Sequence, residues 1–237
     1  MSETQPFQFK QFSIEQDKCA MKVGTDGILL GAWADVEGAS SILDIGAGTG
    51  LIAIMLAQRT ETADIHAVEI DEEACAQAAT NMENSPWANR LKAILSPIQD
   101  YAKLSRQRYD LIVSNPPFFT GGTFTKSQDK TSVRHTVKLP HGDLLTSVRS
   151  LLASKGKFCA VLPNMEGLRL QELASTYGLF CTKKTVVKPL HDRPVERLLL
   201  QFEREEKELK KDELVIQFEG ANNWTEEFKT LTGAFYL

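Results

Sequence analysis

The sequence lacks several features that would assign it at once to a class of protein. No apolar run approaches the roughly 20 residues that a membrane-spanning helix needs. The first six residues have neither the charged nor the apolar region of a secretory signal. The formal net charge of −4 argues against a uniformly basic nucleic-acid-binding protein, but it allows a local basic face. We therefore expect a globular cytoplasmic protein with no membrane partner.

Residues that build metal centres and disulfides are also scarce. The four cysteines lie far apart and include no Cys-x-x-Cys pair, so each is expected to be a small buried hydrophobe in a reducing compartment. His135 has no partner residue at metal-ligand spacing. The sequence therefore predicts no metal site, and no disulfide among Cys19, Cys75, Cys159 and Cys181.

The order of apolar and amphipathic segments is that of an α/β domain. Short apolar runs alternate with longer helical patterns, which predicts βαβ units and a parallel sheet. Strands are expected at 41–45, 64–70, 91–95, 109–114 and 157–162, and helices at 51–58, 72–83, 142–152 and 168–177. Two adjoining strands at 179–188 and 196–203, a charged loop at 203–213, a tail strand at 214–218 and a helix from about 225 follow. A further helix is expected to start near Thr25 or Asp26, with one of them as its N-cap.

The most informative segment is Asn115-Pro116-Pro117-Phe118, which directly follows the strand expected at 109–114. Two prolines remove two backbone donors and fix φ, so the strand must end there in a rigid turn. The turn holds the Asn115 amide and the Pro116 carbonyl at the carboxyl end of a parallel strand, where open α/β sheets bind ligands. A planar amine could donate its two N–H bonds to these acceptors while its ring stacks on Phe118. The arrangement suits methyl transfer to an exocyclic amine, although diproline turns are also common strand terminators.

A glycine-rich turn closes the first expected strand and opens the next helix. The run from Asp44 to Gly50 has the spacing G-x-G-x-G, which lets backbone N–H groups approach a ligand. Dinucleotide-binding enzymes use a similar turn, but here Leu51 stands where their fingerprint needs glycine or alanine. Glu69 lies 23 positions after Gly46, at the end of the second strand, a distance that suits a carboxylate accepting ribose hydroxyls.

In this order, the glycine-rich turn, Glu69 and the Asn115 tetrapeptide resemble the motifs of class I S-adenosylmethionine-dependent methyltransferases. Within that class, the diproline motif with its aromatic residue resembles the enzymes that methylate adenine N6, guanine N2 or a glutamine amide. The segments 9–12, 19–33, 85–87 and 231–237 are similar to the family of bacterial enzymes that N6-methylate adenine 37 of a valine tRNA. The resemblance spans nearly the whole chain, and segment 19–33 is its most specific part.

The resemblance implies a fold and a set of site residues. The fold would be a Rossmann-like α/β fold with a seven-stranded, mostly parallel sheet, helices on both faces and an antiparallel C-terminal hairpin. Residues 1–40 would form an extension over the cofactor site and residues 41–237 the methyltransferase domain, together one globular unit. Asn115, Pro116 and Phe118 would be catalytic. S-adenosylmethionine, with S-adenosylhomocysteine as product, would be held by Lys22, Thr25, Asp44, Gly46, Ala47, Gly48, Gly50, Glu69, Ile70, Ile98 and Asn115.

The expected partner is tRNA, and no obligate protein partner is indicated. The loop at 120–137 is polar and basic, and basic residues recur between 183 and 197. Each alone is more often a solvated surface charge, but together they could form a rim that follows phosphates on an acidic protein. The substrate-binding residues predicted are Pro117, Arg134, His135, Lys188 and Arg193.

Two departures from the family pattern leave alternatives open. Many class I members hold the cofactor adenine with an acidic residue after the third strand, whereas here only Asp100 or a backbone amide is available. Phe118 stands where adenine-N6 enzymes commonly have tyrosine, and phenylalanine is frequent in guanine-N2 rRNA enzymes. The alternatives are that guanine chemistry, or a protein glutamine-N5 methyltransferase, which would usually need a further N-terminal helical domain. From other classes, a catalytically silent S-adenosylmethionine-binding scaffold and a nicotinamide reductase remain.

Overall fold

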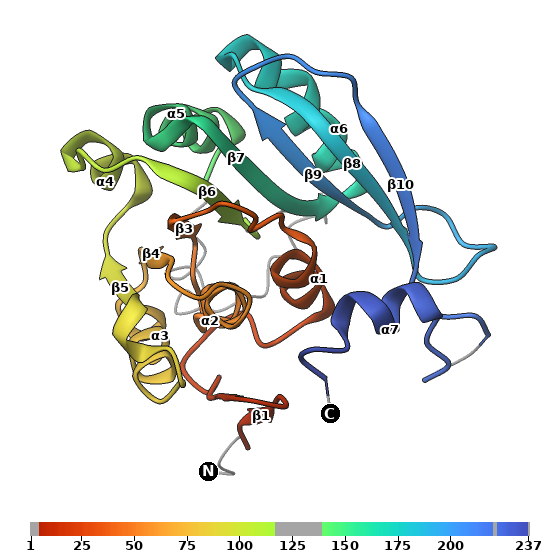
Figure 1. Cartoon of the computed structure of the whole chain (residues 1–237), viewed down its shortest axis with the longest axis horizontal. Helices are drawn as coiled ribbons and strands as arrows, with labels where there is room; N and C mark the ends of the chain where they lie inside the picture. The colour runs from red at the N-terminus through yellow and green to blue at the C-terminus, as the bar shows by residue number, and fades with distance from the viewer. Residues whose placement is uncertain (1–4, 117–138, 220–221, 237) are drawn as a thin grey trace, which may run out of the picture.

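The computed structural model describes residues 5–116, 139–219 and 222–236. An eight-stranded sheet in the order β10-β8-β9-β7-β6-β3-β4-β5 has helices on both faces (Figure 1). A separate antiparallel ribbon of β1 (Phe7–Gln8) and β2 (Ser13–Ile14) precedes it in the chain. None of the helices in the described ranges has the length and apolar character needed to cross a membrane.

Five neighbouring strands of the sheet pair parallel with one another, and β9 next to them is the one strand of the eight described that runs in the opposite direction. The parallel strands are β3 (Ser41–Ile45), β4 (Asp64–Glu69), β5 (Leu91–Leu95), β6 (Tyr109–Ser114) and β7 (Leu152–Pro163). Strand β9 (Arg197–Glu203) pairs antiparallel with both β7 and β8 (Phe180–Lys188). Strand β10 (Lys210–Val215) pairs parallel with β8 at the edge. The central strands are apolar because helices cover both of their faces.

Two hydrophobic cores lie on the two faces of the sheet. One face carries α1 (Thr25–Trp33), α2 (Leu51–Gln58), α3 (Glu72–Glu83) and α7 (Glu226–Thr232). The other carries α4 (Ile98–Leu104), α5 (His141–Leu151) and α6 (Asn164–Ala174). Short 3-10 turns also occur at Ala88–Arg90 and Ser175–Tyr177. Because side chains alternate along a strand, Ile42 joins the core under α1 and α2, whereas Leu43 and Ile45 join the opposite core.

The predicted α/β fold with a mostly parallel sheet and an antiparallel hairpin is confirmed, but the strand count is wrong. The sheet has eight strands, one more than the seven that the resemblance implied. The tail strand expected at 214–218 is β10, which begins at Lys210 within the charged run expected to be a loop and ends at Val215. Leu214 and Val215 are buried while residues 210–213 are exposed, so only the end of this edge strand contributes to the core. Charged residues suit an edge, where they oppose pairing with another chain.

The expected N-cap of the first helix is also wrong. Gly24 takes that position in extended conformation, and no side chain caps the helix. Asp26 lies in the first turn instead, where both carboxylate oxygens accept from Arg197 Nε at 3.0 and 2.8 Å. The carboxylate therefore links α1 to β9 across the carboxyl edge of the sheet.

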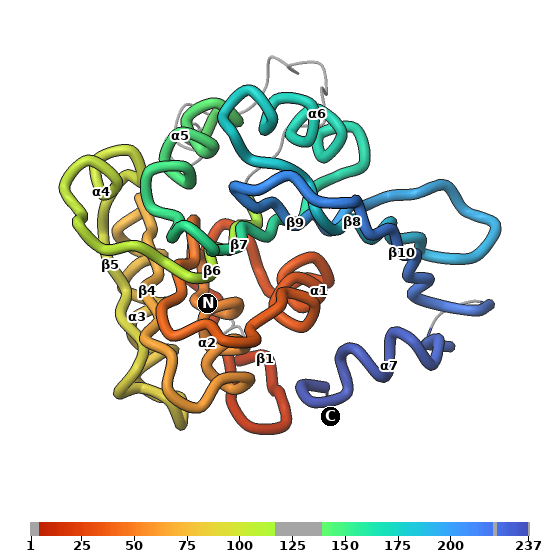
Figure 2. The backbone as a smooth tube through the Cα atoms, turned by 45° about the horizontal axis from the view of Figure 1, so that its top comes forward, coloured from red at the N-terminus to blue at the C-terminus, as the bar shows by residue number. Residues whose placement is uncertain are grey.

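The two ends of the described chain lie side by side (Figures 1 and 2). The backbone N–H of Lys10 donates to the Phe235 carbonyl at 2.9 Å, and Lys10 Nζ donates to the Gly233 carbonyl at 2.6 Å. The Phe9 ring stacks between Phe12 and Tyr236, with centroids 4.5 and 6.4 Å away. The N-terminal segment is thus fixed at one end before it passes over the carboxyl edge of the sheet.

Candidate functional site

The glycine-rich loop between β3 and α2 has a conformation that requires its glycines. Gly46, Gly48 and Gly50 all have positive φ, at 77°, 52° and 80°, a region that residues with a Cβ rarely adopt. The N–H groups of Gly46 and Ala47 donate to the Val68 carbonyl at 2.9 and 3.2 Å, which anchors the loop to the end of β4. A Cβ added at Gly46 or Gly48 would meet no atom within 4 Å, so this side of the loop is open.

Glu69 holds the glycine loop from the neighbouring strand. Its Oε2 accepts from the Gly48 N–H at 2.9 Å, and its Oε1 accepts from the N–H groups of Ile70 and Asp71 at 2.8 and 3.0 Å. A carboxylate offers about four acceptor positions, so one remains on Oε2 for a ligand. The apolar side chain of Ile70 next to it is 43% exposed. The Glu69 carboxylate and the exposed Ile70 side chain can therefore give a ligand one polar and one apolar contact.

Asp44 is a buried carboxylate beneath this loop. It faces the α1 and α2 side of the sheet, as Ile42 does two positions earlier, and none of its surface is exposed. Neither oxygen has a hydrogen-bond partner among the described residues. Burial raises the pKa of Asp44 to about 7, and the negative charge of Glu69 adds to the rise. The Ala53 N–H in the first turn of α2 opposes this rise without making a full hydrogen bond.

Asn115 is held beside the glycine loop by the residue before it. Ser114 Oγ donates to the Ile45 carbonyl at 2.9 Å, and these two residues are register partners at the ends of β6 and β3. Asn115 Oδ1 is buried and accepts no hydrogen bond from the described residues. Pro116, which follows it, is buried too. Buried polar atoms are normally paired, so two unpaired acceptors at adjacent strand ends point to a ligand that brings donors or positive charge.

A cleft of about 500 Å³ joins these elements. Its walls include residues 21–27, the glycine loop at 46–49 and Asn115. Lys22 and Thr25, both predicted from sequence, line this cleft and are exposed. The cleft then extends along the carboxyl edge to the ends of β8 and β10.

Sequence reasoning missed most of the far side of this cleft, apart from the basic residues expected between 183 and 197. Its lining residues there come from β8, β9, the loop between them and the turn after β10: Val187, Pro189, Glu196, Arg197, Ile216, Gln217 and Trp224. They belong to no motif, and they meet only because β10 pairs with β8, the pairing that the strand prediction did not include. In the sequence, the signal that could have indicated this side of the cleft is Trp224, which follows the expected tail strand.

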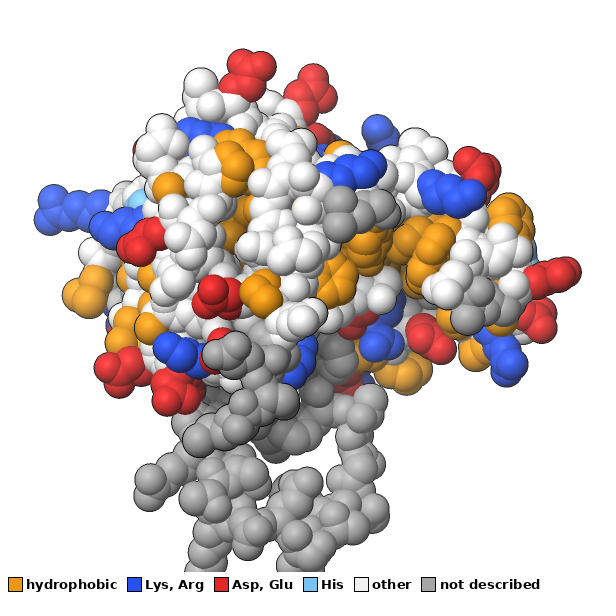
Figure 3. Space-filling view, turned by 90° about the horizontal axis from the view of Figure 1, so that it is seen from below, with side chains coloured by type: hydrophobic (Ala, Val, Ile, Leu, Met, Phe, Trp, Pro, Cys, Tyr) orange, Lys and Arg blue, Asp and Glu red, His pale blue; other side chains and the backbone are white. Residues whose placement is uncertain are grey.

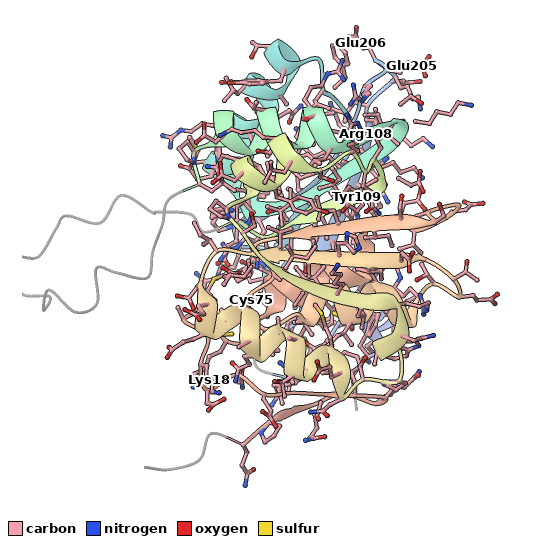
Figure 4. All side chains as sticks on the ribbon, turned by 90° about the vertical axis from the view of Figure 1, so that its left-hand side faces the viewer. Lys18, Cys75, Arg108, Tyr109, Glu205 and Glu206 are labelled. Atoms are coloured by element: carbon pink, nitrogen blue, oxygen red, sulfur yellow. The ribbon has the colours of Figure 1, made fainter. Side chains whose placement is uncertain are left out.

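Buried amides fasten the N-terminal segment over the site. Asn81 Nδ2 donates to the Glu15 carbonyl at 2.9 Å and to the Thr49 carbonyl at 2.8 Å, and its Oδ1 accepts from the Glu15 N–H at 2.9 Å. Gln77 Oε1 accepts from the Lys18 N–H at 3.1 Å, and Figure 4 shows Lys18 beside α3 near Cys75. Asn81 and Gln77 are 2% and 4% exposed. Helix α3 therefore connects the N-terminal segment directly to the glycine loop.

The remaining predicted residues lie in different surroundings. The Ile98 side chain is buried in the core under α4, so only its backbone is available to a cofactor. Asp100 is exposed and pairs with Lys103 at 3.1 Å. Lys188 pairs with Glu213 at 2.8 Å, and Arg193 is exposed in the loop between β8 and β9. Four predictions lie outside the described residues: Pro117, Phe118, Arg134 and His135.

Comparison with known proteins gives a consistent group of relatives. The model of the methyltransferase small domain matches residues 23–172. A protein of Trichodesmium erythraeum named tRNA1(Val) (adenine(37)-N6)-methyltransferase is 48% identical over 98% of this chain and 97% of its own length. Proteins with the same name from Histophilus somni and Escherichia coli are each 44% identical, over 100% and 98% of this chain and 99% and 94% of their own lengths.

Solved structures are similar in fold. A structure described as a predicted O-methyltransferase from Agrobacterium tumefaciens has a TM-score of 0.71 at 18% identity, covering 89% of this chain and 96% of its own. The glycopeptide N-methyltransferase MtfA, complexed with S-adenosylmethionine, has a TM-score of 0.54 at 14% identity, covering 78% and 90%. At these identities the similarity concerns the fold alone.

Proposed function

The chain belongs to the family of tRNA1(Val) (adenine(37)-N6)-methyltransferases, and from this premise we propose that it methylates the N6 amine of adenine 37 in valine tRNA with S-adenosylmethionine. The structural observation that carries the proposal is the unpaired acceptor Asn115 Oδ1, in the same cleft as the glycine loop. An acceptor in that position suits an amine that must donate a hydrogen bond while it reacts.

The residues at the carboxyl edge fit this cofactor. When bound, S-adenosylmethionine supplies a methyl group on a positively charged sulfonium. The open glycine loop and the unpaired Asp44 carboxylate suit its cationic amino-acid part, with Lys22 and Thr25 at the rim. Glu69 and the exposed Ile70 suit the ribose and the adenine ring. The pyrophosphate of a nicotinamide cofactor would instead bring negative charge toward Asp44, which argues against the reductase alternative.

Asn115 and Pro116 act on the amine through hydrogen bonds. The lone pair of an adenine N6 amine is delocalised into the ring, which makes it a weak nucleophile. The Asn115 side-chain oxygen and the Pro116 carbonyl accept its two N–H bonds, localise that pair and orient it for in-line attack. As positive charge develops on N6, these fixed acceptors stabilise the transition state more than the ground state. Phe118 supplies the stacking surface for the base.

The N-terminal segment serves as the cover of the cofactor site in this proposal. It is tied to α3 by Asn81 and Gln77, and residues 21–27 then form one wall of the cleft. Contacts with tRNA phosphates are assigned to the cations at the rim, among them Arg134, His135, Lys188 and Arg193.

The experiment that tests the function is methyl transfer from labelled S-adenosylmethionine to total tRNA from a strain without this gene, followed by nucleoside mass spectrometry. Label in N6-methyladenosine is the expected result. Label in N2-methylguanosine would mean that the target is guanine and not adenine. The proposed hydrogen bonds from the amine to Asn115 and Pro116 would still apply. Cofactor binding without label in any RNA or release factor would favour the silent scaffold.

A further inference from the structure

We infer that the far end of the cleft binds a second nucleobase of the RNA, an unstacked neighbour of the base that is methylated. This inference rests on the proposed function and adds a site for a flanking nucleotide. We call this end the lateral arm and define it by Val187, Pro189, Ile216, Gln217 and Trp224.

The lateral arm lies on the side of Asn115 away from the proposed ribose site. Glu69 and Ile70, at the end of β4, do not line the cleft, whereas Asn115 does. In the sheet, β4 lies on one side of β6, and β8 and β10 lie on the other. The cofactor nucleoside and the occupant of the lateral arm therefore approach Asn115 from opposite directions, so both can be present at once.

The chemistry of the walls suits a planar ring. The Trp224 ring stacks on Phe228 with centroids 5.0 Å apart and an interplanar angle of 25°, and Phe228 is 2% exposed, so the indole is held in place. Met21, from the wall formed by residues 21–27, lines the same cleft and is 52% exposed, so it presents an apolar surface to the cleft. Gln217 adds a side-chain amide, which can both donate to and accept from a base edge.

The backbone of this region is fixed before any ligand arrives. The N–H groups of Ile216 and Gln217 donate to the carbonyls of Lys188 and Pro189 at 2.9 and 3.0 Å. The Thr225 N–H donates back to the Ile216 carbonyl at 3.0 Å, and Thr225 Oγ1 donates to the Val215 carbonyl at 2.5 Å. A wall held in this way loses little conformational entropy on binding, which favours affinity.

The surface around the arm combines apolar, aromatic and basic side chains. In Figure 3, hydrophobic side chains gather on the side of the molecule where α7 and β10 lie. Close to the arm, the Phe218 ring is 45% exposed with the His191 ring 6.3 Å away, and Arg193 is exposed in the same loop as His191. Aromatic rings interleaved with cations are the usual means of binding single-stranded nucleic acid.

The reaction itself creates the need for such a site. An N6 amine can be reached only when its base is unpaired and outside the stack. The neighbouring base then loses a stacking partner, and a protein ring that replaces the lost contact stabilises the opened strand. The Trp224 ring lines the same cleft as Asn115, so it can replace the stacking contact that the neighbouring base loses.

The test is the Trp224→Ala variant with an anticodon stem-loop RNA that the wild-type enzyme methylates. We expect KM for this RNA to rise about tenfold, the size of one lost base–aromatic stack. Affinity for S-adenosylmethionine and kcat at saturating RNA should change little. Trp224→Phe, which keeps an aromatic ring, should restore most of the loss. Gln217→Ala, at a partly exposed position in the arm, should shift KM in the same direction and does not endanger the core.

Abasic substitution identifies the bound nucleotide. An abasic residue next to the target should weaken binding to the wild-type enzyme about tenfold but weaken binding to Trp224→Ala far less, because both changes remove the same contact. Additive losses at every position beside the target, with methylation intact, would overturn this inference alone. A wild-type enzyme that methylates no RNA would overturn the proposed function and this inference with it.

Discussion

Asn115 and Asp44 are both buried acceptors near the ends of adjacent strands, but Asn115 lines the cleft whereas Asp44 lies beneath the glycine loop. Asn115 Oδ1 is neutral and lies where β6 ends, next to the acceptor Pro116. Asp44 is a carboxylate beneath the first turn of α2. In the proposed mechanism the first acts on the amine and the second on the cofactor, so their substitutions should have separable effects.

Replacing Asn115 by alanine removes an acceptor that is used as charge develops on the amine. We expect kcat to fall about 100-fold or more with little change in the Kd of S-adenosylmethionine, measured by calorimetry. Ser114→Ala is the matched comparison: it loses the hydrogen bond to the Ile45 carbonyl that positions Asn115 but keeps the Asn115 amide, so it should lower kcat less. An Asn115→Ala variant that loses cofactor binding would show that this amide belongs to the cofactor site.

Asp44 should make the stability of the ligand-free protein fall as pH rises. Burial raises its pKa from 3.8 to about 7, so between these values the folded state keeps a proton that the unfolded state has released. The free energy of unfolding then decreases with pH across this window and is constant above it. Asp44→Asn cannot ionise, so its stability relative to wild type should increase between pH 4 and 7, by at most about 4 kcal/mol.

Urea unfolding of both ligand-free proteins at several pH values measures this difference. The control is Asp64→Asn, which removes an exposed carboxylate from the start of β4. A gap between wild type and Asp44→Asn that does not depend on pH would mean that Asp44 is ionised throughout. The same substitution should weaken cofactor binding at pH 8, because the amide has no charge to offer the ammonium group.

At the scale of elements, helix α3 determines where the N-terminal segment lies. Asn81 contacts Glu15 and Thr49 through three hydrogen bonds, so one side chain connects the segment to the glycine loop. Losing a buried hydrogen-bonding partner costs about 1–3 kcal/mol because the groups left behind are unsatisfied. The groups left unsatisfied are backbone groups of Glu15 and Thr49, which lie next to the proposed cofactor site.

The Asn81→Ala variant should therefore release the segment and weaken cofactor binding. We expect the Kd of S-adenosylmethionine to rise about tenfold, with kcat at saturating cofactor close to wild type, since Asn81 is not in the cleft wall. Limited proteolysis should show faster cleavage within residues 5–24. Thr80→Ala, an exposed neighbour on α3, is the control. Unchanged affinity together with faster cleavage would show that the segment does not cover the cofactor.

The elements that sequence patterns predicted well are those whose burial is visible in the residue pattern itself. The strands at 41–45 and 109–114 are apolar because they are buried on both faces, and their ends carry the two motifs of the site. Strand β10 was misplaced because four of its six residues are exposed and its pairing with β8 depends on tertiary contacts. The lateral arm could not be predicted, since Val187, Pro189 and Trp224 come together only in the folded chain.

At the scale of the whole molecule, the question is how a chain with a net charge of −4 binds a polyanion. The cations predicted at the rim are not equivalent in the structure. Lys188 is 24% exposed and paired with Glu213 at 2.8 Å. Arg193 is exposed, and its side chain forms no ion pair with the rest of the described chain. A cation that is already paired gains less from a phosphate, because it must first lose its carboxylate partner.

Arg193→Ala should consequently weaken tRNA binding more than Lys188→Ala does. Each phosphate contact that is lost reduces the slope of log K against log salt by about one, so the Arg193 variant should show a reduced slope and the Lys188 variant a slope nearer to wild type. Lys103→Ala, in α4 far from the loop between β8 and β9 (Figure 1), is the matched control for the loss of one charge. Binding measured between 50 and 200 mM salt tests the difference. Equal slopes for Arg193→Ala and Lys103→Ala would mean that this loop does not contact phosphates, and the RNA path would then be sought elsewhere along the carboxyl edge.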